Sequence, residues 1–214
     1  MNWRALRIGA AVVALWLHVG SGAQAAKFPG SVIDGETGKP LAGVWVIGHV
    51  MTGGGFVQGG SGCEITIAQS GEDGRYVLDT GGGLFGLLSH SSRPGEYLVK
   101  PGYREDARPT YKERDKKPFV MVPDRRSAME QLMDLAKTVK HTDCGTDYVL
   151  ENKATLMPFY RAAAEHARRL SQTRREWNVA FAVIEWEYFL EAGSWDRGAQ
   201  RAREEEQSKM KVIE

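Results

Sequence analysis

Apolar residues before Pro123 gather in short segments, and in residues 64–67 they alternate with polar residues, as in a half-buried strand. Short segments rich in Val, Ile and aromatic residues are separated by Gly, Pro and Asp turns, a pattern typical of the strands of an antiparallel β-sandwich. The expected strands cover residues 31–34, 42–50, 64–67, 75–78, 96–99 and 118–122. Two glycine-rich stretches, 53–60 and 81–83, lack any nucleotide-binding fingerprint and are interpreted as loops between strands.

The strongest strand signal, residues 42–50, is apolar on both faces. Successive side chains of a strand point to opposite faces, which gives two sets: Val44 and Val46 on one face, and Trp45, Ile47 and His49 on the other. Such a strand is typical of the centre of a sheet that is covered on both sides. Trp45 is therefore expected in the core, with a ligand-binding face as the alternative.

The pattern changes after Pro123, where Gly becomes scarce and apolar residues recur at helical spacing. Ser127 and Glu130 fit a capping box that opens a helix ending near Lys140. Further helices are expected over 156–170 and 174–190, and Gly193 ends the last one. The chain thus divides into a sandwich over 27–123, a helical appendage over 124–192, and a charged tail over 193–214, expected to be a frayed helix or disordered.

The N-terminus predicts export. Arg4 and Arg7 precede an apolar run of about a dozen residues, and Ala23-Gln24-Ala25 follows as a small-residue cleavage site. Residues 1–25 are therefore predicted to be a cleavable signal peptide, with an N-terminal membrane anchor as the alternative. The run is shorter than the roughly 20 residues that cross a bilayer, and no later run is long enough, so the mature chain is expected to have no transmembrane span.

Three stretches resemble the carboxypeptidase regulatory-like domain. Residues 30–46 (GSVIDGETGKPLAGVWV) match its first strand, its Gly-x-Pro-Leu-x-Gly turn and its second strand. Residues 71–78 (GEDGRYVL) match its acidic turn into an aromatic strand, and 95–103 its closing strand and Gly-Tyr pair. The resemblance covers about residues 28–103. It implies a transthyretin-like β-sandwich, usually a non-catalytic module of exported proteins, and it carries no catalytic residue.

Composition narrows the chemistry of the chain. The formal net charge is +1, which gives no electrostatic reason to expect nucleic acid as a partner. Two cysteines, Cys63 and Cys144, in an exported chain predict a disulfide between the appendage and a loop of the sandwich. Two separate thiols, or a metal site that includes His141, are the alternatives. We expect no metal and no cofactor.

No catalytic motif is present: the chain lacks HExxH and G-x-S-x-G. The leading hypothesis is a periplasmic or secreted, non-enzymatic module that binds or scaffolds an envelope protein or glycan. The candidates for residues that face a ligand are Trp45, His49, His90 and His141. One alternative is a hydrolase or metal-dependent enzyme of transthyretin-like fold, which requires the histidines to converge. The other is a carbohydrate-binding module, which requires Trp45, Tyr76 and Tyr97 in an exposed row.

Overall fold

The computed structural model describes residues 26–52, 62–80 and 94–210. The predicted signal peptide lies outside these residues. The strands are β1 (Ala26–Asp34), β2 (Trp45–Thr52), β3 (Gly62–Gln69), β4 (Arg75–Thr80), β5 (Gly95–Val99), β6 (Tyr103–Ala107) and β7 (Phe119–Pro123). The helices are α3 (Ala128–Lys140), α4 (Thr146–Glu151), α5 (Lys153–Leu170), α6 (Arg174–Ala192) and α7 (Trp195–Met210). The predicted α+β class, with strands first and helices after, is confirmed.

The strands form two sheets, ordered β4-β1-β7-β6 and β3-β2-β5. Most neighbours are antiparallel, as predicted, but β1 and β7 pair in parallel, with Val32 opposite Phe119. The predicted antiparallel arrangement thus holds for the other pairs but not for this one. Strand β6 was not predicted, because its sequence YREDA lacks apolar alternation; it forms by pairing with the edge of β7.

Two hydrophobic cores lie on the two faces of β2, which is the central strand of its sheet, as predicted. Val44 and Val46 belong to the core between the two sheets, together with Leu78 and Phe119. On the other face, Ile47 belongs to a larger core shared with the helices, and Trp45 packs against that core. The alternation in residues 42–50 thus separates a sheet-facing set from a helix-facing set.

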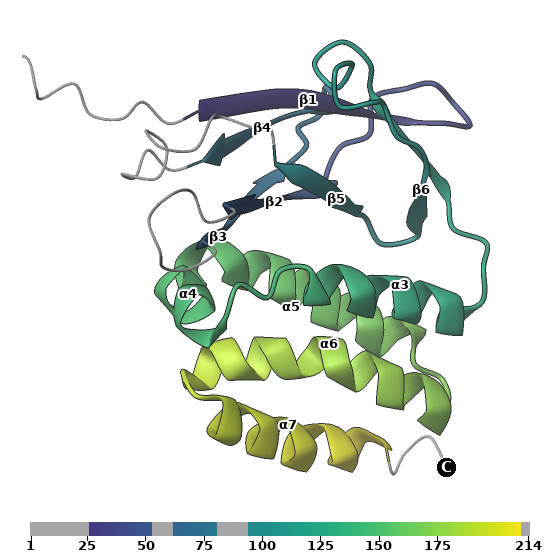
Figure 1. Ribbon diagram of the computed structural model, residues 1–214. Helices are drawn as coiled ribbons and strands as arrows, with labels where there is room; N and C mark the ends of the chain where they lie inside the picture. Colours follow the sequence, from purple (N-terminus) through teal and green to yellow (C-terminus); the bar gives the residue numbers. More distant parts are fainter. Residues whose placement is uncertain (1–25, 53–61, 81–93, 211–214) are drawn as a thin grey trace, which may run out of the picture.

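The helices cover the open face of the β3-β2-β5 sheet in successive layers (Figure 1). Helices α3 and α5 lie next to the sheet, α6 lies beneath them, and α7 forms the outer layer. The predicted capping box of α3 is present, with the Glu130 amide donating to Ser127 Oγ and the Ser127 amide donating to the Glu130 carboxylate. Helix α6 ends as predicted at Gly193, which adopts a left-handed φ of 65°. Within the described residues, no helix has the length and apolarity required to cross a membrane.

The charged C-terminal segment is helical and packed, which corrects the expectation of a frayed or disordered tail. Helix α7 buries Ala202 and Glu206 against the rest of the helical layer. The hydroxyl oxygen of Tyr188 on α6 lies 2.9 Å from Glu205 and 3.0 Å from Glu206, and the two carboxylates share its one hydrogen. Arg168 of α5 pairs with Glu206 at 2.9 Å. Sequence alone suggested solvation because charged residues dominate here, but Glu205 and Glu206 have partners on α5 and α6.

Candidate functional site

A groove opens where the two sheets separate. Strand β5 is an edge of one sheet and β6 an edge of the other, and α3 lies across the gap between them. The groove between these three elements has a volume of about 290 Å³. This is near the lower end of the range for small-molecule sites. It suits one compact chemical group rather than a large ligand.

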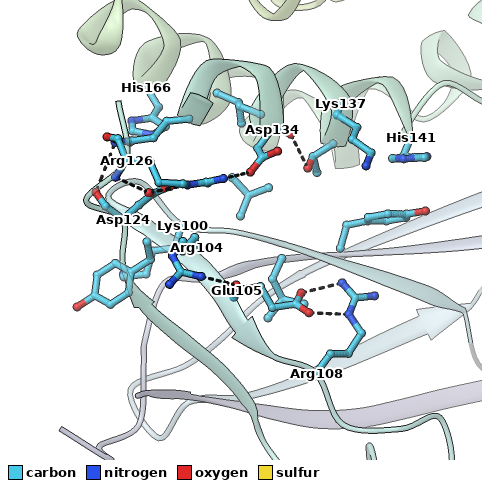
Figure 2. A pocket seen from close by; sticks show the side chains of 17 residues that line it. Lys100, Arg104, Glu105, Arg108, Asp124, Arg126, Asp134, Lys137, His141 and His166 are labelled. Atoms are coloured by element: carbon cyan, nitrogen blue, oxygen red, sulfur yellow. Dashed lines mark hydrogen bonds and ion pairs between the residues drawn. The ribbon is translucent and has the colours of Figure 1, made fainter. Parts of the chain in front are cut away.

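Charged side chains line the groove from both sides (Figure 2). Its cationic residues are Lys100, Arg104, Arg108, Arg126 and Lys137, and its carboxylates are Glu105, Asp124 and Asp134. The lining therefore has two more permanent positive charges than negative ones, although Arg104 also meets Asp106 at 3.4 Å beside the groove. An excess of one sign of charge in a concave site concentrates its electric field and favours ligands of opposite charge.

Two of the arginines are held by carboxylates that themselves line the groove. Arg108 donates to both oxygens of Glu105, at 2.6 and 2.7 Å. Arg126 donates to Asp124 at 2.7 and 2.9 Å and to Asp134 at 2.6 Å. The hydrogen bonds from Arg126 lower the pKa of Asp124 despite its partial burial. These pairs fix the walls of the groove, since bidentate arginine–carboxylate contacts are geometrically specific.

The two lysines differ from the arginines. Lys100 donates to the carbonyl of Ala42 at 2.7 Å, and Lys137 projects from α3 toward the strands. Among the residues that the structure describes, no carboxylate forms an ion pair with either ammonium group. Both therefore keep a positive charge that can meet an incoming anion. Lysine acts as a compact point charge with rotatable donors, which suits anionic ligands of varied shape.

Histidines complete the lining. His141, which caps the C-terminus of α3, stacks on Tyr97 of β5 with ring centroids 4.5 Å apart. His166 of α5 also faces the groove. Burial, together with the nearby charge of Arg169, lowers the pKa of His166, so this side chain is neutral at pH 7. The permanent positive charge of the groove thus comes from its lysines and arginines.

A second cluster joins the sheet to the helices. Cys63 and Cys144 of the α3–α4 connection form a disulfide with Cα atoms 5.4 Å apart, as predicted. Cys63 lies in strand β3, however, and not in a loop as expected. His49 Nε2 lies 3.1 Å from Cys63 Sγ. Burial lowers the pKa of His49, and nearby His141 lowers it further, so the imidazole is neutral at pH 7. The disulfide closes a sequence separation of 81 residues and connects the two parts of the fold.

The candidate ligand-facing residues have different environments. His141 lines the groove, whereas His49 contacts the disulfide. Trp45 is half-buried and meets Phe159 of α5 edge to face, at 6.1 Å, as a core residue does. His90 lies outside the described residues. Tyr76 is 3 % exposed, so Trp45, Tyr76 and Tyr97 do not form an exposed aromatic row.

Sequence reasoning missed the charged lining of the groove. Lys100, Arg104 and Arg108 recur at intervals of four, which has no periodic meaning in a strand and turn. On α3, Asp134, Lys137 and His141 do share one helical face, and that signal was available. It indicates a polar surface, however, and does not say what the surface faces.

Comparison with known proteins adds no assignment: no family model, no curated protein and no solved structure matches this chain. The resemblance to the carboxypeptidase regulatory-like domain therefore rests on the turn and strand motifs of the chain itself.

Proposed function

We propose that this protein is an exported, non-enzymatic binding module of the cell envelope, and that the groove between β5, β6 and α3 receives an anionic group of its partner. The groove's excess of positive charge is the observation that carries the proposal. A module built on a transthyretin-like sandwich, as the sequence motifs suggest, fits a binding role. The disulfide supports export, because such bonds persist in oxidising compartments.

The proposed ligand chemistry is a carboxylate or phosphate group carried by an envelope component. Lys100 and Lys137 supply cationic donors from opposite walls, one from the strands and one from α3. The volume of about 290 Å³ fits the anionic group and one adjoining unit. A surface-exposed ammonium contributes modestly to such binding and is screened by salt. The affinity is therefore expected to be moderate and to decrease with ionic strength.

Lys137→Gln tests this proposal, and Lys140→Gln is its matched control on the same helix. Both lysines are exposed, but only Lys137 lines the groove. Binding of two probes, an oligogalacturonate and a poly-glutamate peptide, is measured by calorimetry at low and physiological salt. We expect K137Q to weaken binding about three- to tenfold, because one close charge contributes about 1 kcal/mol at a partly exposed site. K140Q is expected to leave it unchanged.

The two probes separate the sources of the anionic group, since the first is a glycan and the second a peptide. Preference for one of them identifies the partner class. Equal weakening by K137Q and K140Q would mean that general surface charge, rather than the groove, attracts anions. Absence of binding to both probes and to inorganic phosphate at low salt would refute the anionic-ligand proposal. Export is tested separately by the intact mass of the protein recovered from the periplasm, expected to lack residues 1–25.

A further inference from the structure

The cluster of His49, Cys63 and Cys144 has an arrangement that the proposed function does not use. One nitrogen or sulfur atom from each residue lies within 4.8 Å of the other two. Each residue is partly buried, so the cluster is neither sealed in the core nor fully exposed. Sequence reasoning considered His141 as the imidazole partner of these cysteines. The structure places His49 against Cys63 instead, and His141 on Tyr97.

Strand pairing explains why these atoms come together. In the β2–β3 register, His49 is opposite Ile65 and Met51 is opposite Cys63. His49 and Cys63 are thus diagonal neighbours on one face of the sheet. This is the helix-facing side, where Ile47 and Ile65 pack against the helices. The α3–α4 connection brings Cys144 to the same point, and Tyr148 holds it there by hydrogen bonds to both the amide and the carbonyl of Ile65.

We propose that, when the disulfide is reduced, Cys63, Cys144 and His49 bind a thiophilic cation such as Zn²⁺. Reduction breaks the S–S bond and adds two electrons and two protons. In the test a phosphine supplies the electrons and becomes a phosphine oxide, while water supplies the oxygen of that oxide and the two protons. Zn²⁺ then replaces the two thiol protons, which are released, and takes Nε2 of His49 as third ligand. Water occupies the fourth position of the tetrahedron.

The geometry needs only small movements. On tetrahedral zinc, two thiolates lie about 3.8 Å apart and a thiolate and an imidazole nitrogen about 3.5 Å apart, given metal bonds of about 2.3 and 2.0 Å. Two non-bonded sulfur atoms separate to a similar distance after reduction. His49 Nε2 already lies 3.1 Å from Cys63 Sγ.

Zinc binding to the phosphine-reduced protein tests the proposal, with the excess phosphine removed under anaerobic conditions. Competition with a chromophoric chelator gives the affinity, and Co²⁺ substitution reports thiolate bonding through its charge-transfer absorption. We expect one Zn²⁺ per chain and release of about two protons near neutral pH. His49→Gln should weaken binding about 100-fold or more by removing a ligand. His141→Gln, the matched control, should change it less than threefold.

Three results would overturn the proposal. One is equal affinity of the reduced wild type and a Cys63→Ser, Cys144→Ser double variant. Another is equal affinity of H49Q and the wild type. The third concerns folding, which circular dichroism of the reduced protein reports with and without Zn²⁺. A reduced chain that stays unfolded with Zn²⁺ contradicts the proposal, because the site depends on the pairing of β2 with β3. A reduced chain whose thermal midpoint rises with Zn²⁺, and does not rise in H49Q, supports the proposal.

Discussion

The fully buried carboxylate of Glu96 allows a quantitative test of the packing between the two sheets. Glu96 lies on β5 at 0 % exposure. Its Oε1 accepts a hydrogen bond from the Tyr76 hydroxyl at 2.9 Å, and its Oε2 accepts one from Arg114 Nη1 at 2.9 Å. The side chain of Arg114 is itself only 11 % exposed. Arg108 additionally donates to the Glu96 carbonyl at 2.8 Å, so two arginines bind the edge of β5.

Glu96→Gln keeps the shape of the side chain and removes its charge. Arg114 then remains buried without its counter-charge, and breaking a buried pair in this way costs about 3–5 kcal/mol. Tyr76→Phe removes one hydrogen bond to a charged acceptor and should cost less, about 1.5–3 kcal/mol. Because folded domains are stable by only about 5–15 kcal/mol, E96Q should leave a protein that is folded but much less stable.

Urea denaturation followed by circular dichroism measures these differences. For an m-value of about 2 kcal/mol/M, the midpoint of E96Q should fall by about 1.5–2.5 M, with m unchanged. The double variant Glu96→Leu, Arg114→Met removes both charges, so it should cost less than the sum of its two single variants. Destabilisation of E96Q by less than about 1 kcal/mol, or additive effects in the double variant, would refute a strongly coupled buried pair.

Two further predictions concern the disulfide and the hydrogen-bonded carboxylate of Asp34. Cys144→Ser opens the loop that the disulfide closes over a sequence separation of 81 residues, and should lower the free energy of unfolding by about 4.5 kcal/mol in the chain-entropy model. Cys63 should then be open to alkylation in intact-mass measurements. An unchanged urea midpoint would contradict this prediction. Amides of the following turn, that of Thr37 foremost, and the Tyr103 hydroxyl lower the pKa of Asp34. Since the folded-state pKa is below the unfolded one, this stabilisation is present above the unfolded pKa of about 3.9 and is lost as pH falls through the folded one. The urea midpoint of Asp34→Asn should therefore decrease less than that of the wild type between about pH 5 and pH 2.5. An equal decrease in the two proteins would exclude this role of Asp34.

Local sequence determined the individual elements. Residues 42–50 are apolar on both faces and predicted a strand with two buried faces, and Val46 and Ile47 lie in the two separate cores. Ser127 and Glu130 predicted where α3 begins, because their capping hydrogen bonds join residues three apart. The disulfide could be predicted as well, since only two cysteines are present and export favours their oxidation.

Only the tertiary structure decided which elements and side chains meet. Strand β6 and the parallel β1–β7 pair depend on an available strand edge, which has no local sequence signal. Helix α7 is packed because Arg168 and Tyr188 on other helices bind its carboxylates. The same holds for both sites: the groove exists because α3 crosses two sheet edges, and His49 lies beside Cys63 because of the β2–β3 register. These contacts join residues far apart in sequence, and periodicity reports only on neighbours within a few residues.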